Sequence, residues 1–242
     1  MHSEEAVQPK AAVALLLIAD ISARARLWGF SRFVLGTLPL RGIEGLSFAK
    51  QLGSGEEGGF GLKPSLSIQG LFLAFDHPEQ AHGFWQAHPL AKSYQDYATE
   101  CFGLIAYPLS ARGSWSGHKP FAVDTALQSA GEPVAALTRA SIRLRHARAF
   151  WSKAPAAQSA LAEHPDCQLA IGLGEAPLLR QATFSIWTSA AAMDAYARSG
   201  AHLAAIRAAS AGRFFSEDMF VRFKPLASFG SWKGQRLRFG GE

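Results

Sequence analysis

The sequence predicts an α+β protein in which one β-α-β-β-α-β unit occurs twice. Apolar stretches of strand length alternate with stretches of helical spacing, and the same order is found before and after a central segment. That segment, residues 117–133, has glycine and proline near both ends, which is typical of a linker. We therefore expect an N-terminal half at 11–116, a linker at 117–133 and a C-terminal half at 134–232, each half with a ferredoxin-like fold.

The two halves also resemble each other directly. AVALLLIADISARARLWGF resembles PVAALTRASIRLRHARAFW, AKQLGSG resembles AIGLGEA, IQGLFLAF resembles RQATFSIW, and YPLSARGSW resembles FKPLASFGSW. Four matches in the same order indicate an internal duplication. A four-stranded sheet with helices on one face must bury its other face, so we expect the two sheets to face each other. The result would be an intrachain α+β barrel of the kind usually made by a dimer, with a pocket between the sheets.

The elements of the first half follow from their patterns. The first apolar run has about eleven residues, too few for a membrane span of roughly 20, and it reads as a buried strand. The acidic Glu4 and Glu5 before it, and the lack of a small-residue cleavage site after it, are unlike a secretory signal. The other predicted elements are a helix at 22–40, a strand broken by a glycine-rich loop at 45–64, a strand at 65–76, helices at 78–99 that restart at Pro89, and a strand at 101–115.

The second half repeats this order. A strand and a helix are followed by a strand with a glycine turn and by a further strand. A helical region that breaks near Gly200 and a final strand complete the unit. The predicted ranges are 134–142, 143–164, 167–180, 181–188, 190–211 and 219–227.

Composition narrows the class of protein. The chain has 242 residues, is 48% hydrophobic and contains 17 Phe and 6 Trp, enough for a large core and an apolar pocket. The net charge is +5, but Lys and Arg are scattered, so a nucleic-acid partner is not expected. Cys101 and Cys167 lie in no zinc-binding spacing, which favours the reducing cytoplasm.

Three segments resemble the spheroidene monooxygenase family of bacterial carotenoid pathways. They are LGSGEEGGF, SARGSWSGHKPF and the long stretch at 172–226, and the similarity extends from about residue 12 to residue 226. The resemblance implies a haem b enzyme that uses O2 to introduce a keto group at C-2 of an acyclic carotenoid, by successive hydroxylations. It also implies a hydrophobic polyene substrate and an external electron donor such as a ferredoxin. A basic surface would permit peripheral contact with the inner membrane, although the sequence shows no clear amphipathic anchor.

Other functions fit the same fold. They include a haem dehydratase or peroxidase, a cofactor-independent oxygenase, and a protein that only binds an apolar ligand. No cysteine lies in a thiolate-haem loop and no CxxCH motif is present, so a bound haem would need another ligand.

His202, in AYARSGAHLAAIR, is the predicted axial ligand of the haem iron. Haem enzymes with a duplicated ferredoxin-like fold, such as chlorite dismutases, dye-decolourising peroxidases and aldoxime dehydratases, hold iron through a histidine of the C-terminal half. This is an analogy between folds. Small neighbours would let a flat macrocycle approach the helix, namely Gly200, Ala201, Ala204 and Ala205. The alternative is a surface or capping histidine.

His88 is the built-in comparison, because it holds the corresponding place in the first half. It precedes Pro89, which suits the first turn of a helix, so we expect a structural role at a helix start. Five further histidines are not expected to bind a metal: His77, His82, His118, His146 and His164.

Four other residues are candidates for contact with the cofactor. Phe215 and Met219 lie in an aromatic-rich stretch after the His202 helix and would line the haem or a polyene channel, with an ordinary core as the alternative. Arg112 and Arg180 would meet haem propionates or a distal ligand, since a guanidinium suits carboxylates. Surface arginines are the alternative, and no catalytic residue is predicted.

Overall fold

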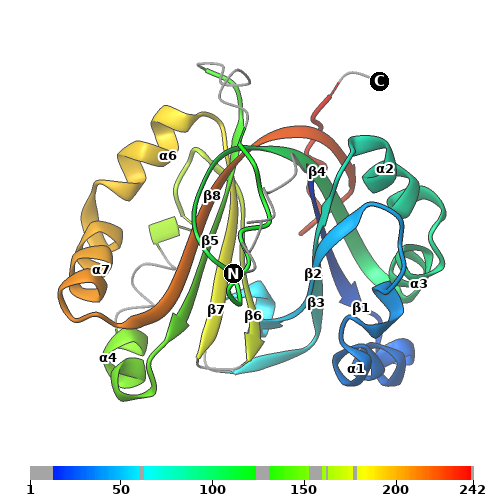
Figure 1. Cartoon of the computed structure of the whole chain (residues 1–242), viewed down its shortest axis with the longest axis horizontal. Helices are drawn as coiled ribbons and strands as arrows, with labels where there is room; N and C mark the ends of the chain where they lie inside the picture. Colours follow the sequence, from blue (N-terminus) through cyan, green and yellow to red (C-terminus); the bar gives the residue numbers. More distant parts are fainter. Residues whose placement is uncertain are drawn as a thin grey trace, which may run out of the picture.

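The computed structural model describes residues 13–59, 63–123, 131–152, 160–161, 163–176 and 179–240. Its eight strands form a closed antiparallel barrel in the order β1-β3-β2-β6-β7-β5-β8-β4. Helices cover the barrel on two opposite sides (Figure 1). The predicted α+β barrel is therefore confirmed. The strands are β1 (Val13–Ile21), β2 (Leu46–Gly55), β3 (Pro64–Phe75), β4 (Ala98–Gly113), β5 (Val134–Ile142), β6 (Cys167–Ala176), β7 (Arg180–Trp187) and β8 (Phe215–Gly230).

Two seams join the strands of the first half to those of the second. At one seam β2 meets β6 at the single pair Gly53 and Gly174. At the other, β4 and β8 are each 16 residues long and pair from Phe102 with Gly230 to Gly113 with Met219. Strand β8 also pairs with β5 from Phe215 to Phe223, and this pairing and that with β4 up to Gly230 explain why β8 extends beyond the predicted 219–227 at both ends.

The helices break where the sequence predicts. On the N-terminal side α2 (Pro78–Ala87) ends and α3 (Pro89–Tyr97) begins at His88. On the C-terminal side α6 (Ala190–Ala197) and α7 (Gly200–Ala211) are separate, and Gly200 has a φ of 53°. The other helical elements are η1 (Ala23–Ala25), α1 (Arg26–Leu35), η2 (Leu38–Leu40), η3 (Glu56–Gly58), η5 (Leu144–His146) and α4 (Ala147–Trp151). Of the predicted linker, 124–130 lie outside the described residues, as do 153–159 and 162 of the helix expected at 143–164.

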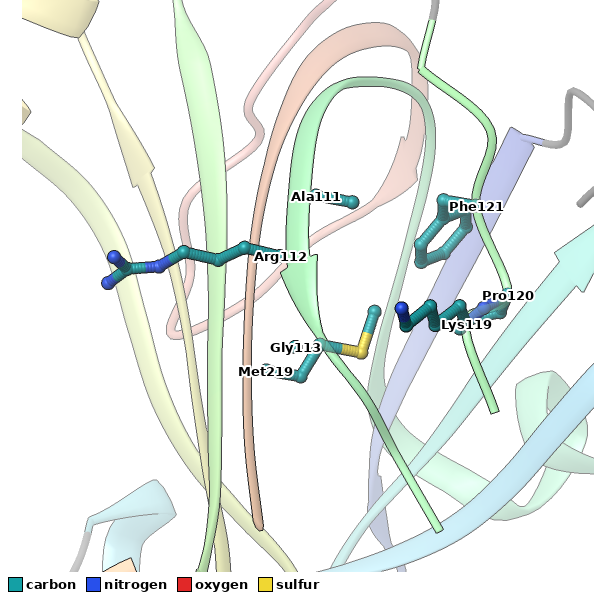
Figure 2. A pocket seen from close by; sticks show the side chains of 7 residues that line it. All are labelled: Ala111, Arg112, Gly113, Lys119, Pro120, Phe121 and Met219. Atoms are coloured by element: carbon teal, nitrogen blue, oxygen red, sulfur yellow. The ribbon is translucent and has the colours of Figure 1, made fainter. Parts of the chain in front are cut away.

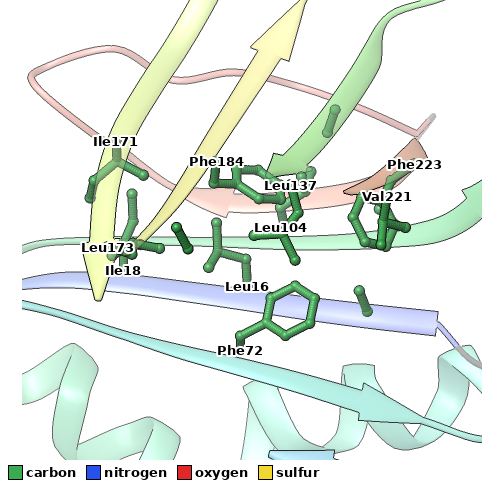
Figure 3. Packing of buried hydrophobic residues seen from close by; sticks show 14 of the residues in the cluster. Leu16, Ile18, Phe72, Leu104, Leu137, Ile171, Leu173, Phe184, Val221 and Phe223 are labelled. Carbon is green, nitrogen blue, oxygen red and sulfur yellow. The ribbon is translucent and has the colours of Figure 1, made fainter. Parts of the chain in front are cut away.

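The barrel interior is a packed apolar core. Side chains from both sheets meet there, among them Phe72, Phe184 and Phe223 (Figure 3). The ring of Phe72 also stacks on that of Trp115, with a centroid distance of 5.4 Å. Phe72, Leu104, Leu137 and Val221 are each at most 1% exposed. Large side chains of both sheets fill the space around these residues, so the pocket expected between the two sheets is not found here.

A second core lies between the N-terminal sheet and its helices. Leu15 and Leu17 of β1 and Leu71 and Leu73 of β3 are fully buried there. Trp85 of α2 belongs to the same cluster. The outer face of this sheet is thus sealed by α2 and α3.

Candidate functional site

The outer face of the C-terminal sheet carries much smaller side chains than that of the N-terminal sheet. Where the duplicated segments align, each of the four buried leucines of the first half is replaced by alanine, threonine or serine. The replacements are Leu15 by Ala136, Leu17 by Thr138, Leu71 by Thr183 and Leu73 by Ser185. We call Ala136, Thr138, Gly172, Thr183 and Ser185 the small-residue face.

These residues lie side by side across neighbouring strands. Thr138 of β5 pairs with Thr183 of β7, and Thr183 pairs with Gly172 of β6. On its other side Thr138 pairs with Phe220 of β8. The small side chains therefore form one continuous surface in the middle of the sheet.

The small-residue face is open at its centre. Thr138 is exposed and Thr183 is half-buried, whereas the aligned Leu17 and Leu71 are 0% exposed. A residue in the middle of a central strand becomes buried when a helix packs on it, so space remains above Thr138. Helices α6 and α7 lie on the outer side of this half (Figure 1).

Two guanidinium groups border this surface at Phe220. The Cζ of Arg112 lies 5.3 Å, and that of Arg222 5.8 Å, from the centroid of the Phe220 ring. Arg222 also forms an ion pair with Asp194 of α6, which ties that helix to β8. Arg112 comes from β4 of the first half, so the edge of the surface is built from both halves.

His202 is in α7, and its side chain lies outside the described part of the chain. Its predicted role as axial ligand stays a prediction. The competing His164 has a structural role: its Nδ1 accepts the backbone N–H of Asp166 at 3.3 Å, and its ring lies 5.2 Å from that of Trp187.

The structural role predicted for His88 is confirmed. Its Nδ1 accepts the backbone N–H of Leu90 at 3.2 Å, which caps α3, and its ring stacks on Phe84. Partial burial lowers the pKa of His88. The residue at the corresponding place in the first half is therefore a cap within a well-packed layer.

The other candidates are not gathered in one place. Met219 is 2% exposed in the barrel core. Together with Arg112 and Phe121 it borders a cavity of about 140 Å³, and Figure 2 shows the Arg112 guanidinium turned away from Met219. Phe215 packs on Phe150 of α4, with a distance of 6.0 Å between the ring centroids. Arg180 is exposed at the start of β7. Only Arg112 among these four borders the small-residue face.

A partly buried polar cluster lies at one end of the barrel, and sequence reasoning missed it. The Arg139 side chain is 2% exposed and pairs with Glu217 and, at 3.3 Å, with Glu175. Glu175 also accepts from Lys50 Nζ at 2.8 Å and from Trp115 Nε1 at 2.9 Å. We call these five residues the polar cluster.

The charges of the polar cluster are balanced by hydrogen bonds. Burial raises the pKa of Glu217, but four hydrogen-bond donors lower it by more. They are the backbone N–H of Gly117, the Ser114 hydroxyl, the backbone N–H of Ser116 and the Arg139 guanidinium. The pKa falls to about 2. Burial likewise raises the pKa of Glu175, while Lys50, Trp115 and Arg139 hold it below its usual value. Both carboxylates are thus charged and paired, which fits a structural role.

We expect Glu217→Gln to weaken the fold at neutral pH by roughly 1–3 kcal/mol, because a charged acceptor of several donors is lost. The pKa of Glu217 is depressed from 4.5 to about 2, so its contribution is present above pH 4.5 and is lost as pH falls through about 2. The stability gap between variant and wild type should therefore close in acid. Urea unfolding across this pH range measures it, and a gap independent of pH would contradict the assignment.

Glu100 offers a matched control. Its carboxylate accepts from Ser231 Oγ and from the backbone N–H groups of Lys233 and Gly234, as Glu217 does from Ser114, Ser116 and Gly117. It has no guanidinium partner among the described residues. Glu100→Gln should lower stability less than Glu217→Gln.

At the other end of the barrel, uncharged residues take the places of Arg139, Glu175 and Lys50. Where the halves align, Ile18 takes the place of Arg139, Ser54 that of Glu175, and Ile171 that of Lys50. Across the described ranges, no group of three or more His, Cys, Asp or Glu side chains could hold a metal ion.

Fold and site together define a class: a single-chain α+β barrel in which one outer layer is sealed and the other is open at Thr138. Two solved structures share this fold, both of aldoxime dehydratases. One, in complex with butyraldoxime, has a TM-score of 0.60 at 9% identity and covers 89% of this chain and 79% of that chain. The other has a TM-score of 0.57 at 11% identity, with 89% and 81% covered.

Sequence comparison then gives the family. Spheroidene monooxygenases from three bacteria are similar to this chain. That of Rubrivivax gelatinosus is 54% identical over 93% of this chain and 86% of its own length. Those of Rhodobacter capsulatus and Cereibacter sphaeroides are 40% and 32% identical over 86% and 87% of this chain, and 87% and 65% of their own. The chain belongs to the spheroidene monooxygenase family, a family of oxidoreductases.

No model of a known protein family matches the chain. Within the described ranges, none of the helices is both long enough and apolar enough to cross a membrane.

Proposed function

We propose that this protein is a haem-dependent monooxygenase that uses O2 to place a keto group at C-2 of an acyclic carotenoid. Its place in the spheroidene monooxygenase family supports the reaction class and a polyene substrate. The haem, the carbon position and the external electron donor come from the family resemblance. Two successive hydroxylations at one carbon give a geminal diol, and loss of water from it gives the ketone. One oxidative reaction, carried out twice, therefore accounts for the product.

The observation that carries the proposal is the open small-residue face. A haem is flat and wide, so it needs a layer in which a sheet and its helices do not pack directly on each other. The N-terminal layer is filled by Leu15, Leu17, Leu71 and Leu73, whereas the C-terminal layer has Thr138 exposed at its centre. Because Ala136 and Trp187 pack against Met193 and Tyr196 of α6, we infer that the haem would lie over the centre of this face, at Thr138 and Thr183, on the side of α7.

The residues around this layer suit the group. His202 of α7 would donate a ring nitrogen lone pair to the iron. Arg112 and Arg222, which lie at the edge beside Phe220, would pair with the propionate carboxylates. Trp187 and Tyr196, with ring centroids 5.1 Å apart, would form an apolar wall. When bound, the haem supplies the iron chemistry that activates O2 with electrons from a donor such as a ferredoxin.

The chain itself would bind and orient the substrate and exclude water. The barrel interior is filled, so the polyene would reach the reacting centre through the outer layer. Among the described residues, the hydroxyl groups of Thr138 and Thr183 have no hydrogen-bond partner, so each could donate a hydrogen bond at the face.

The test uses purified protein reconstituted with haemin. We expect a Soret band, and then conversion of spheroidene by the reduced protein with ¹⁸O2 and a ferredoxin system to a ketone that contains labelled oxygen. Product formation without any haem would identify a cofactor-independent oxygenase instead. A Soret band without oxygenation of any acyclic carotenoid would favour a dehydratase or peroxidase. The absence of both the Soret band and the oxygenated product would favour a protein that only binds an apolar ligand.

A further inference from the structure

Helix α1 turns an apolar face toward solvent. Leu27, Phe30 and Val34 lie at positions i, i+3 and i+7, so they share one side of the helix. They are 90%, 63% and 77% exposed, and Leu38 in η2 is 51% exposed. We call these four residues the α1 stripe. Apolar side chains normally face the core, so a continuous exposed set indicates a surface that binds something.

The opposite side of α1 is held tightly against the sheet. Gly29 is buried, and its carbonyl accepts from Gln69 Nε2 at 2.8 Å. A Cβ at Gly29 would come within 2.9 Å of that nitrogen, so a larger residue would not fit without movement. Trp28 packs against Tyr94 and Tyr97, with ring centroids 4.9 Å away in each case. The helix therefore cannot rotate to bury the stripe.

Arginines surround the stripe. Arg24, Arg26 and Arg41 are exposed and Arg32 is half-buried, and residues 21–43 contain no acidic side chain. The segment around α4, with the exposed Arg143, Arg145, Arg148 and Leu144, lies toward the same end of the molecule as α1 (Figure 1). This end of the protein is thus both basic and apolar.

We propose that the α1 stripe and its arginines dock on the surface of an anionic lipid bilayer. Exposed apolar side chains of an amphipathic helix enter the boundary between headgroups and acyl chains, while arginines pair with lipid phosphates. A second copy of the chain fits less well, because an isologous contact would bring arginines against the same arginines. The helical spacing of 22–40 was visible in the sequence, but the outward direction of its apolar side was not.

Vesicle flotation of the full-length protein tests this docking. We expect binding to vesicles of phosphatidylcholine with phosphatidylglycerol, and weaker binding to phosphatidylcholine alone. The triple variant Leu27→Gln, Phe30→Gln, Val34→Gln should lower the partition coefficient at least about tenfold. Arg24→Gln with Arg26→Gln should lower binding to the anionic vesicles by about fivefold per arginine and leave binding to phosphatidylcholine unchanged.

Val123→Gln is the matched control for Val34→Gln. Val123 is 37% exposed and lies outside the stripe, so the same chemical change there should leave binding unaltered. Because the stripe is exposed, the thermal unfolding midpoint of the triple variant should match that of the wild type.

Three results would overturn the proposal. They are no vesicle binding by the wild type, binding that survives in the triple variant, and a triple variant that loses self-association in gel filtration without any effect on vesicles. Vesicle binding needs no haem. Vesicle binding by a protein that takes up no haemin would therefore contradict only the proposed function. Haemin uptake without vesicle binding would contradict only the proposed lipid-docking surface.

Discussion

His202→Ala is expected to remove the Soret band of the haemin-reconstituted protein. A haem in a layer with a single protein ligand depends on that ligand for its spectrum and much of its affinity. Absorption spectra during haemin titration measure both. Added imidazole should restore a Soret band in the variant, because a free ring can occupy the position that the side chain vacates.

Two other histidines serve as controls. His88→Ala removes the cap of α3, and His164→Ala removes an acceptor for the backbone N–H of Asp166. Both should lower stability by about 1 kcal/mol and leave the Soret band in place. If His202→Ala retained the Soret band and His164→Ala lost it, the iron ligand would be His164 and not His202.

Filling the small-residue face should prevent haem binding without harming the fold. Thr138→Leu with Thr183→Leu restores the side chains that Leu17 and Leu71 provide in the other half. We expect haemin affinity to fall at least about tenfold, since bulk replaces the space that the macrocycle needs. Stability to urea should be unchanged or higher, because threonines that are partly solvated become apolar contacts.

The reverse change in the first half is the control. Leu17→Thr, at a residue that is 0% exposed, should destabilise the protein by roughly 2–4 kcal/mol through lost packing, and haemin affinity should not change. Wild-type haemin affinity in the double leucine variant would show that the haem does not bind in this layer.

Local signals in the sequence predicted most of the elements. Unbroken apolar runs gave β1 and β3, and the breaks at Pro89 and Gly200 follow from backbone chemistry that these residues impose wherever they occur. The direction of α1 could not be predicted in this way. Apolar residues on a helix repeat with the same period whether they face the core or the solvent. The close packing of Gly29 on the sheet fixes the direction, but in the sequence a glycine only indicates a low helix propensity.

The site was predictable in part. The alternation of Ala135, Leu137 and Arg139 along β5 places the arginine inside the barrel, so this member of the polar cluster was within reach of sequence reasoning. Its partners were not, because Lys50 and Glu175 meet only through the contact between β2 and β6. The contrast between Leu17 and Thr138 was also visible in the aligned halves, but the open space above Thr138 requires the packed structure.

The two carboxylate caps make the halves interdependent. Glu217 of β8 holds the turn that follows β4, and Glu100 of β4 holds the turn that follows β8. Each half therefore completes the end of the other, as two identical subunits exchanging their tails would. One outer face is packed with leucines that stabilise the fold, whereas the other carries small side chains with Thr138 exposed, so the two halves share their ends but differ in the layer that we propose for the haem.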